Sequence, residues 1–351
     1  MPVKADGQNP ESMRFHLIKA AGRPLFAVPC GSARLRDDAA MCFPVHTWKK
    51  RVVRDAVRLA SRTGLIRRLF PATETPLPGM PEGALENWLS DMRALLADPD
   101  LQPMLVWPGD PARGRIYLNL LGSDGRARTF CKLSLDARND ALIRHEGETL
   151  AELAMLDLKL SRIPEVIAKG LLGGHTYLVV SCSPRDARAS DWERDKPIND
   201  AIGEFAGVTR TISAAEASAL SWWPRIVDCH RSHPCFFEEV SKAVQSGVEV
   251  CRIHGDLNQT NVLRDGNDIW LLDWEQSHAD GPALTDPVCV AVDRLFRMHP
   301  KNAAGNLQMF RNQFLKDRDH AARHQAILAL AYLGAVRFTP ALAIIGAWQQ
   351  D

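Results

Sequence analysis

Three polar residues that could bind a metal ion or orient a hydroxyl group lie close together in the chain. Asp256 and Asn261 are five residues apart in the segment HGDLNQTNVL, and Asp273 follows in LLDWE. Each segment adjoins a short apolar run that reads as a strand, and the turn Asp265-Gly266 separates the two runs. We therefore expect Asp273 to return on the strand next to the one that carries Asn261.

This set of side chains suits phosphoryl transfer. That reaction needs metal ions on the phosphates, a carboxylate that orients the attacking hydroxyl, and a cation near the phosphates that are not transferred. The Asp256 carboxylate can meet an acceptor hydroxyl, while the amide oxygen of Asn261 and the carboxylate of Asp273 can bind a metal ion. Mg²⁺ prefers such oxygen ligands and keeps several of its waters, so two protein ligands are sufficient.

The two segments closely resemble the aminoglycoside phosphotransferase and choline kinase family, whose fold is similar to that of protein kinases. The family pattern H-G-D-x-x-x-x-N-x-L, followed by a hydrophobic residue and D-W/F-E, is filled at every position. The resemblance implies that Asp256 is the catalytic base and that Asn261 and Asp273 are the Mg²⁺ ligands. It also implies that Asp286, in ALTDP, is a structural acid that positions the loop.

The resemblance further implies a lysine on a strand, for the α and β phosphates, and a glutamate on the next helix that holds the lysine. Lys132 lies in the strand-like segment RTFCKLSL, and Glu146 follows fourteen residues later in a helical pattern. We therefore predict Lys132 and Glu146 as catalytic residues. Glu148 is a second candidate for the glutamate, although it would face another side of the helix.

The resemblance implies two further stretches that contact the nucleotide. The loop WPGDPARGR, with Gly109 and Gly114, would lie over the phosphates, although it lacks a full G-x-G-x-x-G. The segment YLVVSCSP would be the hinge, where backbone groups of Ser181, Cys182 and Ser183 would meet the adenine. The implied cofactors are ATP, with GTP left open, and Mg²⁺.

The hydrophobic pattern predicts the elements that position these residues. Three strands from Met104 onward read as an antiparallel meander, a helix spans about 138–157, and two more strands surround Gly173-Gly174. Beyond Pro184 the pattern is mostly helical. Before the meander, the sequence predicts two short strands at 14–30, a basic helix at 46–70, a proline-rich linker at 71–83 and an amphipathic helix at 84–97.

The predicted fold class is therefore α+β: a protein-kinase-like two-lobed fold with an N-terminal extension. The expected domains are the extension at 1–97, a small antiparallel-sheet N-lobe at 98–183, and a mostly helical C-lobe at 184–351 that carries the catalytic loop.

Composition narrows the kinds of partner and cellular location that we expect for the chain. The 351 residues include 43 basic and 42 acidic side chains, so no overall basic field would attract nucleic acid. The eight cysteines form no C-x-x-C pair, and no apolar run reaches the length of a membrane span. We expect a cytoplasmic protein without a nucleic-acid partner; its oligomeric state is left open.

The basic segment 48–70 has two interpretations. Its cations and the apolar residues Trp48, Val52 and Leu59 could lie on an anionic membrane surface or meet a lipid-phosphate substrate. Alternatively, the segment is a helix packed on a lobe with a solvated charged face, which is the commoner role of such runs.

The predicted function is ATP-dependent transfer of the γ-phosphate to a hydroxyl of a small molecule: a sugar, an amino alcohol or a glycan precursor. The alternative is a catalytically idle nucleotide-binding module with a regulatory or scaffold role. A protein kinase fits less well, because the metal motif is DWE in place of Asp-Phe-Gly and no clear activation segment ends in Ala-Pro-Glu.

Overall fold

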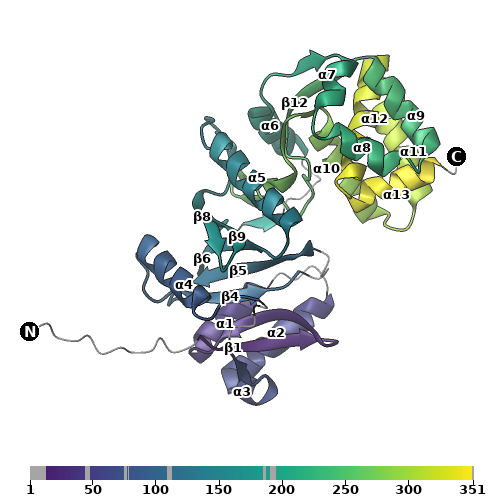
Figure 1. Ribbon diagram of the computed structural model, residues 1–351. Coiled ribbons are helices and arrows are strands. Elements are labelled where there is room, and N and C mark those ends of the chain that lie inside the picture. The colour runs from purple at the N-terminus through teal and green to yellow at the C-terminus, as the bar shows by residue number, and fades with distance from the viewer. Residues whose placement is uncertain are drawn as a thin grey trace, which may run out of the picture. The chain divides into compact units, whose positions relative to one another are not determined.

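The computed structural model describes residues 13–43, 48–74, 77, 79–108, 113–184, 187–189 and 195–349, without the side chains of Lys49, Asp195 and Lys196. The chain forms two compact units (Figure 1). The first consists of Met1–Gly147 with Glu165–Cys182, and the second of Glu148–Pro164 with Ser183–Asp351.

The first unit is built on one eight-stranded sheet in which every neighbouring pair is antiparallel. The predicted meander forms its centre, and the two early strands join the same sheet because β2 pairs with β4 through Phe26 and Ala27. In spatial order the strands are β3 (Ala72–Thr73), β1 (Phe15–Ala20), β2 (Arg23–Pro29), β4 (Gln102–Val106), β5 (Arg115–Leu121), β6 (Ala127–Ser134), β9 (His175–Ser181) and β8 (Val166–Leu172).

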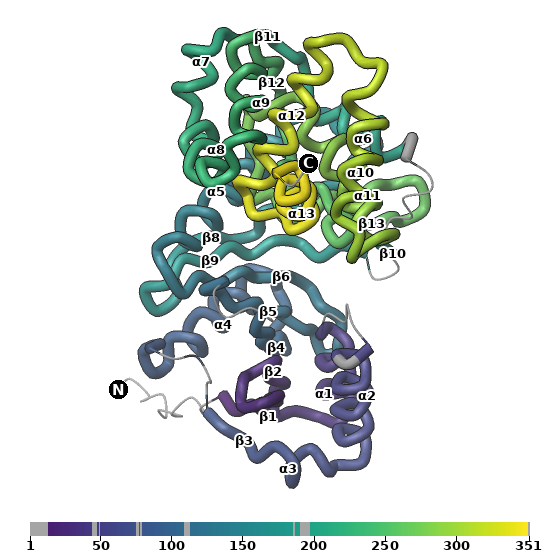
Figure 2. Tube along the Cα trace, turned by 90° about the vertical axis from the view of Figure 1, so that its right-hand side faces the viewer, coloured from purple at the N-terminus to yellow at the C-terminus, as the bar shows by residue number. Residues whose placement is uncertain are grey.

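Alternating side chains divide this sheet into two packed faces. On one face, Leu105, Leu118 and Cys131 pack with the helix α4 (Ala84–Leu95). On the other face, Met104 and Val106 pack with α1 (Ala33–Met41) and α2 (Trp48–Thr63), which lie side by side (Figure 2). The short helix α3 (Ile66–Leu69) follows α2 and buries Ile66 in the same cluster.

The helix α5 (Ala137–Leu153) carries one of the predicted catalytic residues. It starts after Asp136, whose Oδ1 accepts the backbone N–H of Asn139 at 2.8 Å and so satisfies a free donor of the first turn. Buried Ile143 and Leu150 hold the helix in place. The helix overlaps the one predicted at about 138–157, but it begins one residue earlier and ends four residues earlier.

The second unit is mostly helical, as expected, with two small sheets. One sheet has the order β10 (Arg188–Ala189), β13 (Val262–Asp265), β14 (Asp268–Leu271), β7 (Ser161–Arg162), and the other β11 (Arg210–Ile212), β12 (Val248–Ile253), β15 (His278–Pro282). The helices are α6 (Asp195–Ala206), α7 (Ala214–Ala219), α8 (Trp223–His230), α9 (Pro234–Gln245), α10 (Thr285–Met298), α11 (Ala303–Phe310), α12 (His320–Ala335) and α13 (Thr339–Trp348), with single turns η2 (Trp274–Gln276) and η3 (Arg311–Leu315).

The core of the second unit surrounds α12. This helix is buried along 324–334 and packs against α8, α9, α10 and α13. Among the helices that the structure describes, none alone is long and apolar enough to cross a membrane; only α12 and α13 together reach that length, and they are bent by 119° relative to each other.

Candidate active site

The loop between β12 and β13 holds Asp256 in a fixed orientation. The Asn258 side chain donates Nδ2–H to one carboxylate oxygen of Asp256 at 2.9 Å. The Asn261 side chain donates to the Asp256 backbone carbonyl at 2.9 Å and to its other carboxylate oxygen at 3.2 Å. Both oxygens of the predicted base therefore accept an amide hydrogen.

The environment of Asp256 raises its pKa to about 7. Burial is the largest cause, and the negative charges of Asp273 and Glu275 add to it, while the two amide hydrogen bonds oppose it. A carboxylate with a pKa near neutrality is suited to accept a proton from a reacting hydroxyl and to release it afterwards.

Asp286, at the start of α10, holds the same loop through two hydrogen bonds to its backbone. Its carboxylate accepts the backbone N–H of His254 at 2.7 Å and that of Gly255 at 2.9 Å. The side chain is buried, and burial raises its pKa to about 6 although both hydrogen bonds favour the charged form. Asp286 thus contacts the loop that the resemblance implied it would position, and that role stays a prediction.

His254 links the loop to the segment that carries Asp273. Its Nδ1 accepts the backbone N–H of Asp256 at 3.3 Å, so its Nε2–H donates to the carbonyl of Leu272 at 2.9 Å. The ring is fully buried, and its centroid lies 4.4 Å from that of Trp274. His254 is thus a brace within the site.

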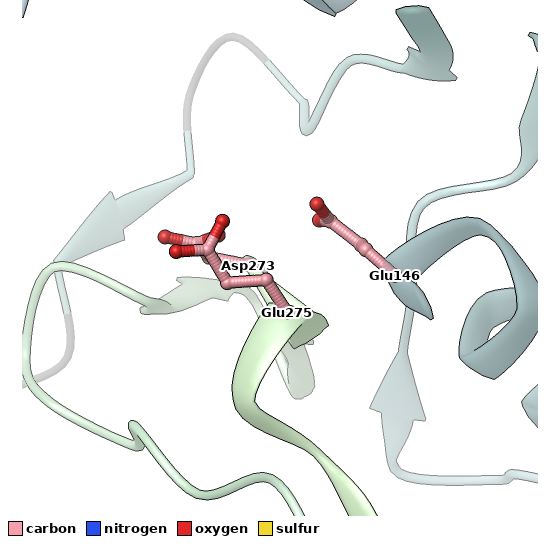
Figure 3. Close-up of side chains that lie close together, drawn as sticks. All are labelled: Glu146, Asp273 and Glu275. Carbon is pink, nitrogen blue, oxygen red and sulfur yellow. The ribbon is translucent and has the colours of Figure 1, made fainter. Parts of the chain in front are cut away.

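Asp273 adopts a left-handed backbone conformation with φ 67°, which non-glycine residues rarely take and which concentrates at functional sites. Its carboxylate and that of Glu275 have oxygens within 4.8 Å of each other, and both project from the same short segment (Figure 3). The amide oxygen of Asn261 is oriented because its nitrogen is bonded to Asp256. Carboxylate and amide oxygens are the donors that Mg²⁺ prefers, so this donor set fits the implied ion.

In the first unit, Lys132 and Glu146 form a buried ion pair. The Lys132 Nζ lies 2.6 Å from a Glu146 carboxylate oxygen, and both side chains are less than a tenth exposed. Glu146 extends from α5 (Figure 3), whereas Glu148 on the same helix is exposed. Cys131 packs into the cluster on the opposite face of the sheet. The expected contact is present, and the catalytic role of the pair stays a prediction.

Apart from Lys132, the predicted nucleotide contacts that the structure describes lie at or just beyond the ends of strands. Gly109 is outside the described residues. Gly114 has φ 52°, and its Cα lies against the side chains of Asp136 and Asn139, where a Cβ would collide with them. Ser181 ends β9, and Cys182 and Ser183 follow it at partly buried positions.

The sequence alone did not assign the roles of two residues beside the base. For Glu275, in the segment DWE, the sequence leaves open a contact with a second metal ion or the nucleotide ribose, and a packing or salt-bridge role. In the structure its carboxylate lies with that of Asp273. Asn258 was not singled out. Its position two residues after Asp256, where an amide readily bonds to a neighbouring acid in a tight turn, was the available signal.

A family model described as the phosphotransferase enzyme family matches residues 115–322, which is more than half of the chain. The chain belongs to this family. The suspected resemblance is therefore confirmed, and so is the fold class: the phosphotransferase has a protein-kinase-like α+β fold with an antiparallel-sheet unit and a mostly helical unit. No curated protein matches the chain.

Several solved structures are similar to this phosphotransferase at low sequence identity. A ternary complex of a thermostable mutant of aminoglycoside phosphotransferase APH(4)-Ia with ADP and hygromycin B is 14% identical, with a TM-score of 0.47, over 76% of this chain and 97% of that one. A putative fructosamine-3-kinase from Thermobifida fusca YX-ER1 is 16% identical, with a TM-score of 0.43, over 71% and 98%. The streptomycin-ATP-APH(2")-IIa complex is 11% identical, with a TM-score of 0.41, over 74% and 97%.

Proposed function

We propose that the protein transfers the γ-phosphate of ATP to a hydroxyl of a small molecule, in the presence of Mg²⁺. The observation that carries this proposal is the arrangement around Asp256. Two amides fix its carboxylate, its pKa is near 7, and the oxygen donors of Asn261 and Asp273 belong to the same hydrogen-bonded and charged network.

Asp256 acts on the acceptor. Its carboxylate receives a hydrogen bond from the acceptor hydroxyl, aligns the oxygen for attack on phosphorus, and takes the proton as the new P–O bond forms. The bond from phosphorus to the β-phosphate bridging oxygen breaks, and the nucleoside diphosphate leaves. Mg²⁺, when bound by Asn261 and Asp273, would neutralise charge on the phosphates.

Lys132 supplies the remaining positive charge. Glu146 holds the ammonium group at the end of an otherwise flexible side chain, so little conformational entropy is lost when phosphates bind. We propose that Lys132 contacts the phosphates that are not transferred. Backbone groups of Ser181, Cys182 and Ser183, together with Gly109 and Gly114, complete the proposed nucleotide contacts.

The acceptor class is part of the proposal. We infer a sugar, an amino alcohol or a glycan precursor, with the helical part of the chain selecting it. We also propose a functional division into an extension (1–97), an N-lobe (98–183) and a C-lobe (184–351). A cytoplasmic location is a further part of the proposal.

The test is nucleotide turnover with matched aspartate variants. Wild-type protein, Asp256→Asn, Asp273→Asn and the control Asp265→Asn would be incubated with Mg²⁺ and ATP or GTP, alone and with a panel of sugars, amino alcohols and aminoglycosides. We expect Asp256→Asn and Asp273→Asn each to lose about a hundredfold or more in turnover, while Asp265→Asn keeps it.

Thermal unfolding of the same proteins separates binding from chemistry. A nucleotide that binds the native state raises the unfolding midpoint by mass action. If nucleotide raises the midpoint of the wild type but no acceptor and no water is phosphorylated, the protein is an idle nucleotide-binding module. If neither occurs, the proposed function is wrong.

A further inference from the structure

The helix α2 carries a second apolar stripe, whose side chains are mostly exposed. Its inner side buries Val57 and Ala60 in the core shared with α1 and the sheet. Trp48, Val52 and Leu59 are 71%, 57% and 64% exposed. At about 100° per residue these three fall within about 40° of one another, and roughly 125° from the buried side. The helix therefore presents two apolar faces.

Two more exposed apolar side chains follow soon after the end of α2 in the sequence. Leu65, just before α3, and Leu69, in its last position, are 47% and 62% exposed. Solitary exposed apolar side chains are ordinary, but five of them on two consecutive helices are the kind of concentration that marks an interaction site. We name this set, Trp48, Val52, Leu59, Leu65 and Leu69, the outer stripe.

Positive charge is concentrated around the outer stripe. Residues 48–70 contain eight of the 43 Lys and Arg residues but only one of the 42 acidic residues, although the whole chain is close to neutral. Arg51, Arg62, Arg67 and Arg68 are exposed there. The single acid, Asp55, accepts a hydrogen bond from Arg54 at 3.0 Å, so its charge is already offset.

The helix is held firmly enough to present this face. Asp37 on α1 accepts hydrogen bonds from Arg58 at 2.9 Å and from Arg62 at 2.7 Å. Ser61 is buried and bonds to the Val57 carbonyl. The apolar side chains of the outer stripe are thus displayed on a packed scaffold and need not be ordered at the moment of binding.

We propose that the outer stripe and its flanking arginines dock on an anionic lipid bilayer. The helix would lie in the plane of the interface, with Trp48, Val52 and Leu59 among the headgroups and acyl ends and Arg51, Arg67 and Arg68 beside lipid phosphates. The exposed apolar side chains suit the apolar interior of such a bilayer, and the flanking cations suit its negatively charged headgroups. The inference does not depend on the proposed catalytic activity.

The test is co-sedimentation of the full chain with vesicles of phosphatidylcholine alone or mixed with phosphatidylglycerol, in about 0.1 M salt. We expect binding to the mixed vesicles only. Leu59→Glu, and separately Arg51→Glu with Arg68→Glu, should each reduce the partition coefficient about tenfold or more. Val208→Glu, at an exposed apolar position elsewhere, and Arg323→Glu with Lys301→Glu are the matched controls and should bind as the wild type does.

Three results would overturn the proposal. One is equal binding to both kinds of vesicle, or to neither. Another is binding that the stripe variants and the controls change alike. The third comes from sedimentation velocity without lipid: a dimer that Leu59→Glu abolishes would assign the outer stripe to a second copy of the chain. An unchanged unfolding midpoint in all variants confirms that the altered side chains act at the surface.

Discussion

At the scale of single residues, the stability of the folded chain depends strongly on the buried ion pair of Lys132 and Glu146. An ion pair removed from water is stable only while both partners are present, because a lone buried charge keeps the full cost of its desolvation. We predict that Glu146→Gln lowers the free energy of unfolding by about 3 kcal/mol. Glu148→Gln, an exposed position on the same helix, should change it by less than about 0.5 kcal/mol.

Denaturant unfolding of the two variants measures this difference. If Glu146→Gln proves as stable as Glu148→Gln, then Lys132 has another partner of equal strength, and its proposed positioning by Glu146 is wrong.

Asp286 should make stability depend on pH in a defined direction. Its pKa in the folded chain, about 6, exceeds its ordinary value of 3.8. The folded state therefore holds this proton more tightly than the unfolded state does, and the stabilisation is complete below pH 3.8 and lost as the pH rises through 6. A shift of this size corresponds to about 3 kcal/mol.

Comparison with Asp286→Asn isolates the effect, since the amide does not titrate. We expect the stability of the wild type relative to this variant to fall between about pH 4 and pH 6 and then to level off. Chemical unfolding at a series of pH values would measure it, and a relative stability that is independent of pH would contradict the assignment.

The sequence alone was sufficient to predict which site residues lie together when those residues are close in the chain. Asn261 and Asp273 lie just beyond the two open ends of one hairpin, and Asp256 is five residues before Asn261, so their proximity follows from a short stretch of chain. It was insufficient for Glu275, because the direction of its carboxylate depends on the left-handed turn at Asp273 that precedes it. A single positive φ in an aspartate leaves no mark in hydrophobic periodicity.

At the scale of elements, the loop after β12 depends on a close approach of two backbones. Gly255 has φ 81°, and a Cβ there would collide with the carbonyl oxygen of Gln276, which also accepts the hydroxyl of Tyr332 at 2.7 Å. Gly266, in the hairpin turn, has φ 58° with nothing within 4 Å of a Cβ. The two glycines share a positive φ and differ in the space around them.

Alanine substitutions at these two positions therefore separate backbone strain from collision. Gly266→Ala should cost about 1 kcal/mol, because only the left-handed conformation is strained. Gly255→Ala should cost at least about 3 kcal/mol and reduce nucleotide turnover as well, since the backbone next to Asp256 must move. Equal losses of stability in thermal unfolding would show that the loop relaxes freely.

The hydrophobic pattern predicted the strands, but it did not predict which strands pair with each other. The strands at 14–30 were recognised, while the pairing of β2 with β4 joins segments about 80 residues apart in the chain. Such pairing depends on which edge is left open by the meander, and no local pattern encodes it.

At the scale of the whole molecule, the N-terminal segment is part of the structure of the first unit. Phe15, Leu85, Trp88 and Leu89 are buried in the same core cluster as residues of β4, β5 and β6. Each fully buried side chain of this kind contributes roughly 1.5–3 kcal/mol, so their joint loss approaches the whole stability of a typical domain.

We therefore expect a chain that begins at residue 98 to aggregate or to bind a hydrophobic dye strongly when it is expressed. Solubility, near-ultraviolet circular dichroism and dye fluorescence, each compared with the full-length chain, measure this outcome. A shortened chain that stays soluble, folded and active would show that the segment at 1–97 is an independent addition.

The left-handed backbone at Asp273 also restricts how this position can change during evolution. A glutamate would offer the same charge to a cation, but its longer side chain gains nothing from the local hydrogen bonds that let aspartate and asparagine tolerate a positive φ. Glycine and asparagine fit the backbone, yet both remove the charge. The shape of the chain and the chemistry of the site thus both favour aspartate at this position.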